Sequence, residues 1–318
     1  MALIGKDIEK AKTLLAQDEV VGIPTETVYG LAGNALSEHA ILKIFEVKNR
    51  PKFDPLIAHT DSFVKVKELV EDVPQQAEQL AKHFWPGPLT LLLEKKEHVP
   101  DLLTSGHPRV AVRIPSHPVT LQLLNSVDFP LAAPSANPFG YVSPTKAHHV
   151  SAQLGHKLEY VLDGGNCSVG VESTIVGFEN GVPTVHRLGG ISLESLEEVV
   201  GKVKLELNTS SNPAAPGMLK SHYSPGRKLV LGDIEGNLKS RDPAVTGVIS
   251  FATTYDLPDE NLFVLSEKGD VNEAAKNLFH ALRSMDRPHI KEVLSERVPE
   301  HGLGRAINDR LRRASARG

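Results

Sequence analysis

Short apolar runs alternate with amphipathic helical segments over residues 1–200, and this alternation limits the choice of fold more than any other feature of the sequence. The predicted strands are 20–24, 56–59, 89–94, 110–114, 131–133, 160–163, 174–178 and 184–188. The predicted helices lie at 7–16, 40–47, 75–85, 118–126 and 192–200. Strands and helices in this order predict a mixed α/β domain with a sheet as its spine.

The character of the sequence changes near residue 205. Residues 208–216 are small, polar and proline-containing, which is typical of a loop or linker. Beyond them we predict strands at 228–231, 246–252 and 262–265 and an amphipathic helix at 271–285. We therefore expect a first domain at 1–204, a linker at 205–227 and a smaller α/β domain at 228–318.

The composition excludes several classes of protein. The 318 residues include 35 Lys and Arg against 39 Asp and Glu, a net charge of −4, which argues against nucleic-acid binding through bulk positive charge. The single cysteine, Cys167, excludes an intrachain disulfide and a cysteine-based zinc site. A single cysteine, together with the absence of a signal-peptide pattern at the start, is typical of a protein of the reducing cytosol, so we predict a cytoplasmic location. No apolar run approaches the ~18 residues of a membrane span, so we expect no membrane partner.

Cations alternate at the end of the helix predicted at 40–47. Pro51 biases Arg50 toward an extended backbone, so this helix is expected to end near Lys48. Lys48, Arg50 and Lys52 would then share one face of the chain. They either bind an anion or form a solvated charge run that suits a helix C-terminus.

The strand around residues 109–115 carries a second group of cations. Its two-residue period places Val110, Val112 and Ile114 on one face, and Arg109 and Arg113 on the other. Because an isolated buried charge is very costly, these guanidinium groups need water or an anion. The strand either faces an anion-binding cavity or is half exposed with surface arginines.

Small polar segments follow or open several predicted strands, at 24–30, 132–138, 143–145 and 173–174. Their hydroxyl and backbone N–H groups suit phosphate and amino-acid recognition, but each segment alone is also typical of a turn or an N-cap. The arginines at 310–313 and Arg317 are interpreted as a disordered basic tail, with RNA contact as the alternative. Neither the pair His148-His149 nor Cys167 shows the surroundings of a metal site or a nucleophile.

Ordered sequence strings together resemble the YrdC-like family of threonylcarbamoyl-adenylate synthases, in its long two-domain form. They are PTETVYGL (24–31), KNRP (48–51), DPLIAH (54–59), FWPGPLTLL (84–92), VAVRIP (110–115), APSAN (133–137), GVEST (170–174), RLGG (187–190) and PGMLKSHYSP (216–225). The resemblance implies a twisted open sheet with a large concave basic cavity, followed by a smaller Rossmann-like α/β domain.

The resemblance also implies an activity. The family condenses L-threonine, bicarbonate and ATP into threonylcarbamoyl-AMP and releases pyrophosphate, which makes it a nucleotidyltransferase. Its product serves tRNA processing, in which separate partner proteins transfer the threonylcarbamoyl group to adenosine-37 of tRNA. We expect Mg²⁺ to accompany the nucleotide through its phosphate oxygens.

The positions that match the family's motifs are the expected site residues. The residues expected to bind L-threonine are Thr27, His59, Arg113, Ala133 and Ser173. Those expected to bind ATP are Arg50, Asp54, Arg109, Ser135, Ser143, Arg187 and Tyr223, with Lys48 and Arg50 supplying catalytic positive charge. Asp54 and Arg109 depart from the family, in which Asn and a small hydroxyl residue are common at these places. The linker is expected to act as a lid, with His222 and Tyr223 reaching inward.

Two other functions stay open from the sequence. One is a non-catalytic RNA-binding module. A weak contact with tRNA or double-stranded RNA is compatible with this module and with the synthase. The other is a transferase or hydrolase that uses a carbamoyl-adenylate made elsewhere. ATP consumption that depends on both threonine and bicarbonate would separate the synthase from both.

Overall fold

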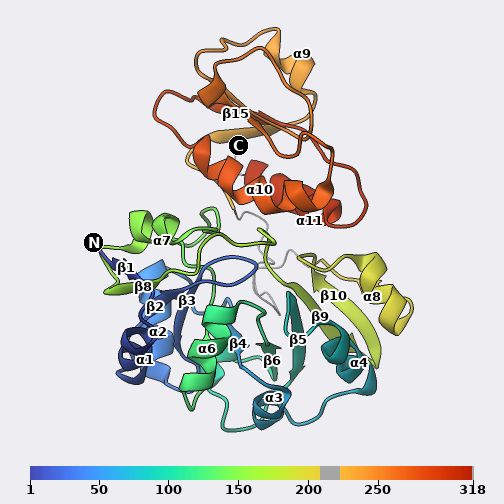
Figure 1. The fold of residues 1–318 in the computed structure, drawn as a ribbon. Helices are drawn as coiled ribbons and strands as arrows, with labels where there is room; N and C mark the ends of the chain where they lie inside the picture. Colours follow the sequence, from blue (N-terminus) through green and yellow to red (C-terminus); the bar gives the residue numbers. More distant parts are fainter. Residues whose placement is uncertain (208–222, 317–318) are drawn as a thin grey trace.

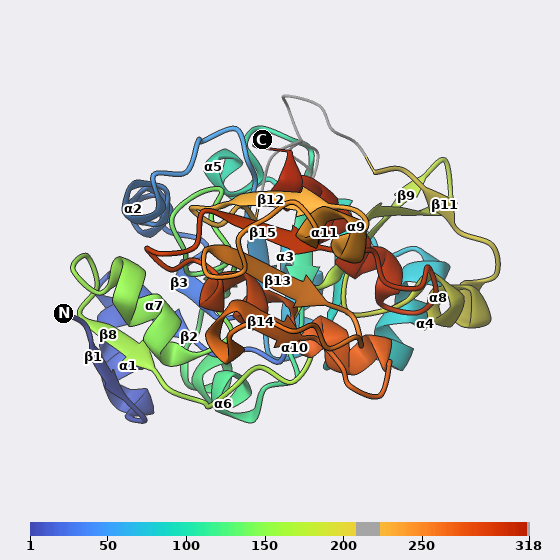
Figure 2. The same ribbon diagram turned by 90° about the horizontal axis from the view of Figure 1, so that it is seen from above.

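The computed structural model describes residues 1–207 and 223–316 (Figure 1). A larger body contains the N-terminal two thirds of the chain, and a smaller body formed by the C-terminal third lies over the middle of its sheet (Figure 2). The predicted mixed α/β fold is confirmed, because each body is built on its own sheet. None of the helices in the described ranges has the length and apolar character needed to cross a membrane.

An eleven-stranded mixed sheet forms the larger body, in the order β1-β8-β2-β3-β7-β4-β6-β5-β9-β10-β11. Its strands are β1 (Leu3–Gly5), β2 (Val21–Ile23), β3 (Gly30–Asn34), β4 (Ile57–His59), β5 (Leu89–Glu94), β6 (Arg109–Arg113), β7 (Leu131–Ala132), β8 (Tyr160–Leu162), β9 (Thr174–Glu179), β10 (Val182–Arg187) and β11 (Lys204–Leu205). All eight strands predicted for this part are present. The strands β1, β3 and β11 were not predicted.

The helices of the larger body pack around this sheet (Figure 1). They are α1 (Ile8–Ala16), α2 (Glu38–Lys48), α3 (Phe63–Leu69), α4 (Gln75–Phe84), α5 (Asp101–Thr104), α6 (Pro118–Ser126), α7 (Ala147–Leu154) and α8 (Leu193–Val200). The helix α2 ends where the sequence predicts, at Lys48, because Asn49 takes a left-handed conformation with φ of 52°. Lys146 is the N-cap residue of α7, so Ser143 does not cap that helix.

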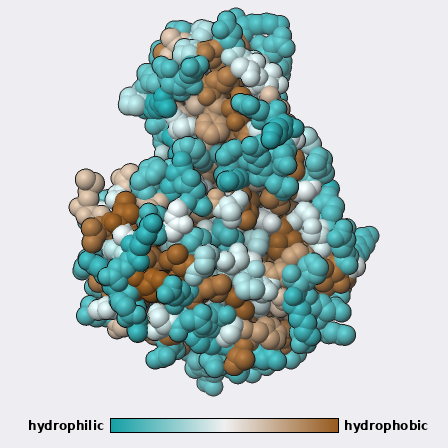
Figure 3. Space-filling model, in the orientation of Figure 1, coloured by the Kyte–Doolittle hydropathy of each residue, from teal (hydrophilic) through white to brown (hydrophobic). Residues whose placement is uncertain are grey.

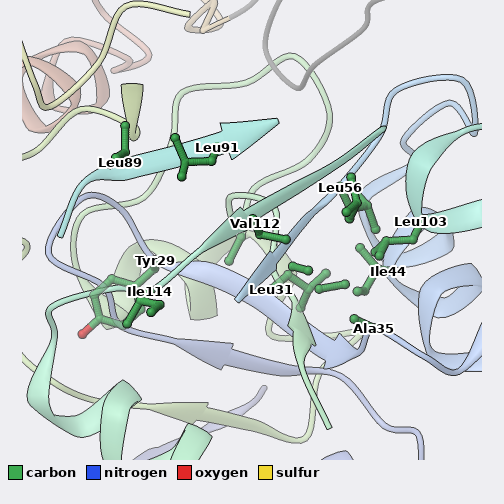
Figure 4. Packing of buried hydrophobic residues seen from close by; sticks show 14 of the residues in the cluster. Tyr29, Leu31, Ala35, Ile44, Leu56, Leu89, Leu91, Leu103, Val112 and Ile114 are labelled. Carbon is green, nitrogen blue, oxygen red and sulfur yellow. The ribbon is translucent and has the colours of Figure 1, made fainter. Parts of the chain in front are cut away.

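The hydrophobic core lies between the helices and the sheet. Figure 4 shows Leu89 and Leu91 of β5, Val112 of β6 and Leu31 of β3 in one apolar cluster. Aliphatic side chains from strands far apart in the sequence therefore hold the centre of the sheet together. On the outer surface, hydrophilic and apolar residues are interspersed (Figure 3).

A four-stranded sheet, parallel throughout, forms the smaller body, in the order β12-β15-β13-β14. Its elements are β12 (Lys228–Leu231), α9 (Ile234–Leu238), β13 (Thr246–Ser250), a 3₁₀ turn η1 (Asp259–Asn261), β14 (Leu262–Val264), α10 (Val271–Ser284), β15 (Glu292–Ser295) and α11 (Gly304–Ser315). The helices α10 and α11 lie between this sheet and the larger body (Figure 1).

The prediction of a disordered basic tail is wrong for residues 310–313, while Arg317 lies outside the described residues. Residues 304–315 form the helix α11, and within it Arg310 has no exposed surface while Arg313 is 4% exposed. These side chains are buried because acidic residues accompany them: Asp309 lies 3.2 Å from Arg310 and 2.9 Å from Arg313. The sequence pattern favoured a solvated run of cations because it does not show which acidic residues pair with these arginines in the fold.

Candidate active site

One pocket in the larger body gathers most of the predicted site residues, with about 510 Å³ of empty space including its mouth. The predicted residues that line it are Thr27, Arg50, His59, Arg113, Ala133, Ser135, Ser173, Arg187 and Tyr223. The sheet register explains part of this grouping, since His59 of β4 pairs with Arg113 of β6 and their side chains share one face. Residues from separate motifs thus line one cavity, and polar groups converge in it as they do in ligand sites.

Arg113 is held by three groups of the protein. Its Nη2 lies 2.6 Å from Oε1 of Glu26, its Nη1 donates to the hydroxyl of Thr27 at 3.1 Å, and its Nε donates to the carbonyl of Gly87 at 3.2 Å. Only 3% of Arg113 is exposed. A buried guanidinium group is therefore fixed in the pocket wall, with its charge balanced by Glu26.

His59 lies beside Arg113 and is almost fully buried. Its Nδ1–H donates to the carbonyl of Ile57 at 3.1 Å. Burial, and then the neighbouring charge of Arg113, lower the pKa of His59 from 6.5 to about 3. The ring is neutral at physiological pH, so it offers hydrogen bonding to a ligand without adding charge.

Arg50 forms an ion pair with Asp54, with 2.9 Å between Nη2 and Oδ2. Its Nε donates to the carbonyl of Asp54 at 3.1 Å, and its Nη2 donates to the carbonyl of Pro55 at 2.8 Å. Asp54 has no exposed surface and does not line the pocket. Burial raises the pKa of Asp54 and the charge of Arg50 opposes this rise. Asp54 therefore acts on the pocket through Arg50.

Ser173 and Arg187 form a second polar part of the wall. Arg187 donates from Nε to the carbonyl of Ser173 and from Nη2 to its hydroxyl, both at 3.0 Å. The hydroxyl of Thr90 lies 2.7 Å from that of Ser173. Burial lowers the pKa of Arg187 to about 10, which leaves the group charged.

Four predicted residues do not line the pocket: Lys48, Asp54, Arg109 and Ser143. The ammonium group of Lys48 is buried and donates to the carbonyls of Ser135 and Asn137, so it supports a pocket loop from behind. The hydroxyl of Ser143 donates to Oε1 of Glu172 at 2.6 Å.

The expectation that Arg109 and Arg113 share one cavity is wrong. The two residues do lie on one face of β6, but four positions apart, which is about 13 Å along a strand. Arg109 pairs with Glu179 of β9 at 2.5 Å instead, and His186 of β10 lies 3.4 Å from the same carboxylate oxygen. The two-residue period predicted the face correctly and carried no information about distance along it.

Sequence reasoning missed two carboxylates. Glu172 lines the pocket, and Glu26 holds Arg113 from behind it. Both belong to motifs quoted above, GVEST and PTETVYGL, but only the hydroxyl residues of these motifs were taken as site residues. An acidic residue beside predicted anion-binding arginines was the available signal, because a buried arginine needs a counter-charge.

The predicted lid falls mostly on residues 208–222, and His222 lies outside the described residues. Tyr223 is described: it is 1% exposed, has a φ of 63° and lines the pocket. Its ring stacks on Phe279 of α10, with 5.4 Å between ring centroids. Among residues 1–207 and 223–316, no group of three or more His, Cys, Asp or Glu side chains is placed to hold a metal ion.

Two family models match the chain. The Sua5/YciO/YrdC family model, described as telomere recombination, matches residues 13–189. The model described as the C-terminal domain of threonylcarbamoyl-AMP synthase matches residues 191–316.

Similar proteins cover nearly the whole chain. The threonylcarbamoyl-AMP synthases of Pyrococcus abyssi and Bacillus subtilis are 41% and 36% identical, each over 97% of this chain and over 94% and 92% of their own lengths. The crystal structure of P. abyssi Sua5 complexed with L-threonine superposes with a TM-score of 0.91 at 39% identity, covering 99% of this chain and 97% of the other. The chain therefore belongs to the Sua5/YciO/YrdC family, in the two-domain form that carries the threonylcarbamoyl-AMP synthase C-terminal domain.

Proposed function

We propose that this protein is an L-threonylcarbamoyladenylate synthase, which condenses L-threonine, bicarbonate and ATP into threonylcarbamoyl-AMP and pyrophosphate. The observation that carries the proposal is the single pocket in which three buried arginines, Arg50, Arg113 and Arg187, meet hydroxyl groups and a neutral histidine. Its relatives of similar length bear this enzyme's name, and one similar structure was solved with L-threonine.

L-Threonine is assigned to the part of the pocket around β4, β6 and β9. Arg113 would bind its carboxylate, because a guanidinium group matches a carboxylate in two parallel hydrogen bonds. The hydroxyls of Thr27 and Ser173 and the ring of His59 supply neutral partners for the amino acid's own polar groups. Ala133 contributes a small side chain that leaves room for the substrate.

ATP is assigned to the part of the pocket around Arg50, Ser135, Arg187 and Tyr223. Asp54 orients Arg50, and Lys48 orients the Ser135 loop, so both serve the nucleotide indirectly. Arg109 has no place in this assignment. Mg²⁺ enters with ATP, because polyphosphate oxygens are ligands that it prefers.

The chemistry needs positioning and fixed positive charge more than proton transfer. The threonine amine adds to carbon dioxide derived from bicarbonate and loses a proton, which gives a carbamate. A carbamate oxygen then attacks the α-phosphorus of ATP, and the bond to pyrophosphate breaks. Buried guanidinium groups that are already held by the protein stabilise the charge on the departing pyrophosphate without reorganisation.

The product and the location of the protein complete the proposal. Threonylcarbamoyl-AMP is a mixed anhydride, so a separate acceptor reaction must consume it. We assign that reaction to tRNA-modifying proteins that act at adenosine-37, and we place the enzyme in the cytoplasm. The RNA-binding alternative loses one of its supports, because Arg310 and Arg313 of the predicted basic tail are buried.

The test is pyrophosphate release by the full chain, with threonine, bicarbonate or ATP omitted in turn. We expect release only when all three are present, and threonylcarbamoyl-AMP as the product by mass spectrometry. Breakdown of an added carbamoyl-adenylate without any ATP consumption would favour the transferase or hydrolase. Salt-sensitive RNA binding without any ATP consumption would favour the binding module.

A further inference from the structure

A carboxylate lies in the wall of a pocket that is otherwise built for anions. Glu172 lines the same cavity as Arg50, Arg187 and Tyr223, and 7% of it is exposed. Its Oε1 accepts a hydrogen bond from Ser143. A bare negative charge at this place would repel a polyphosphate, since like charges in a poorly solvated site interact strongly.

The counter-charge of Glu172 comes from the C-terminal body. Arg310 of α11 donates from Nε and Nη2 to Oε2 of Glu172, at 3.1 and 3.0 Å. Arg310 has no exposed surface, and the two residues are 138 positions apart in the sequence. Its guanidinium carbon also lies 5.2 Å from the ring centroid of Tyr223, a second residue of the pocket wall.

The surroundings hold Arg310 firmly in this place. Its Nη1 donates to Asp309 at 3.2 Å, which directs the opposite edge of the guanidinium group to Glu172. An apolar cluster shared by both bodies includes chain neighbours of the pair, Val171 next to Glu172 and Leu311 next to Arg310, together with Val142, Phe279 and Ile307. The two bodies thus meet through a packed, buried interface directly behind the pocket wall.

We propose that Arg310 is a positioning residue of the active site, which neutralises and orients Glu172 so that the pocket accepts the polyphosphate of ATP. The inference rests on the proposed function for the identity of the nucleotide. It makes the C-terminal domain a part of the site, because that domain supplies the charge that a wall residue of the catalytic domain requires. Arg310 acts through Glu172 and Tyr223 and has no place among the residues that line the pocket.

Substitution of Arg310 separates this role from simple support of the fold. In Arg310→Gln, the carboxylate of Glu172 loses its counter-charge, and we expect the Kd and the KM for ATP to rise about 10- to 100-fold. The KM for threonine should change much less. In Arg310→Gln/Glu172→Gln, no carboxylate is left to neutralise, so the Kd for ATP should return to within about threefold of that of Glu172→Gln alone.

Arg305→Gln is the matched control. Arg305 also belongs to α11 and also pairs across the two bodies, with Glu194 of α8 at 2.5 Å, but neither residue lines the pocket. Its loss should leave the Kd for ATP unchanged. If Arg310→Gln alters that Kd no more than Arg305→Gln does, the proposal is wrong.

The double variant keeps the test decisive if Arg310→Gln alone does not fold, because the pair without charge buries no unpaired carboxylate. If the Kd of the double variant for ATP were far above that of Glu172→Gln, the proposal would be overturned. Calorimetric binding of ATP is measured alongside pyrophosphate release. A wild-type protein that binds ATP but forms no product would refute the proposed function and still leave the role of Arg310 measurable.

Discussion

Replacement of Arg50 by Ala removes a guanidinium group that the proposed function places against the phosphates of ATP. Arg50 lines the pocket, and its Nε and Nη2 are already bound to Asp54 and Pro55. Loss of one contact between a guanidinium group and a phosphate that strengthens in the transition state costs about 2–4 kcal/mol. This cost corresponds to a decrease of about 30- to 900-fold in kcat/KM. The assay is the initial rate of pyrophosphate release at limiting ATP.

The same change has a second effect, on stability. Arg50 and Asp54 lie 2.9 Å apart with 5% and 0% of their side chains exposed, so their gross attraction is about 6 kcal/mol at an effective dielectric constant of about 20. Removal of one partner leaves a buried charge and typically costs about 3–5 kcal/mol. We therefore expect the Tm of Arg50→Ala to fall by roughly 6–20 °C, as measured by calorimetry.

A double variant separates the two effects. In Arg50→Ala/Asp54→Asn both members of the pair lose their charge together, so most of the lost Tm should return while kcat/KM stays low. Arg109→Gln is the matched control for loss of an arginine, because Arg109 pairs with Glu179 outside the pocket. We expect it to keep kcat/KM within about threefold of wild type, since a partly exposed pair contributes less than about 1 kcal/mol. Wild-type kcat/KM in the double variant would refute the assignment of Arg50 to ATP.

Three further predictions test the neighbouring groups. The folded-state pKa of His59 lies near 3, below its ordinary 6.5, so its contribution to stability is complete above pH 6.5 and is lost as the pH falls toward 3. His59→Gln should therefore reduce the loss of unfolding free energy between about pH 6.5 and 5 by about 2 kcal/mol, as measured by urea titration, and an unchanged slope would contradict this. Thr90→Val removes the hydroxyl that lies 2.7 Å from the hydroxyl of Ser173. It should raise the KM for threonine about tenfold, with a smaller effect on kcat. An unchanged KM would exclude Ser173 from the threonine site. Lys48→Met leaves the carbonyls of Ser135 and Asn137 without their donor, at a cost of about 1–3 kcal/mol each. Unfolding should therefore occur at a lower urea concentration, and the KM for ATP should rise. Full activity with lowered stability would show that the Ser135 loop does not serve ATP.

Several elements were predictable from their apolar residues, but the amphipathic helix α11 was taken for a disordered tail because its charges outnumber its apolar residues. The strand β5 and the helix α6 were predicted with their observed bounds, 89–94 and 118–126, because Leu residues fill β5 and recur through α6. The strand β3 has the sequence GLAGN, and glycine is depleted in strands. It is a strand because β2 and β7 pair with it on both sides and because close packing requires small residues: a Cβ at Gly33 would lie 3.2 Å from Ile44. That requirement comes from tertiary structure, which local propensity does not contain.

The candidate site shows the same division between local and long-range information. Motif residues such as Thr27, His59 and Ser173 were expected in the pocket and line it, although their roles stay predictions. The partners that hold the pocket were not predicted. Glu26 and Arg113 are 87 positions apart, and Glu172 and Arg310 are 138 apart. Charge patterns along the sequence show where cations lie but not which carboxylate reaches them through the fold.

Under the proposed function, the buried carboxylate partners explain how a chain with a net charge of −4 can bind a triphosphate. A guanidinium group has five N–H donors. Within the described residues, Arg50 uses its Nε and Nη2, and Arg113 uses one donor on each nitrogen. Each therefore keeps N–H groups free while a carboxylate behind it offsets the cost of burial. Because the charge of the pocket is fixed before substrate arrives, the proposed binding of ATP would depend on these few oriented donors and little on the overall charge of the protein.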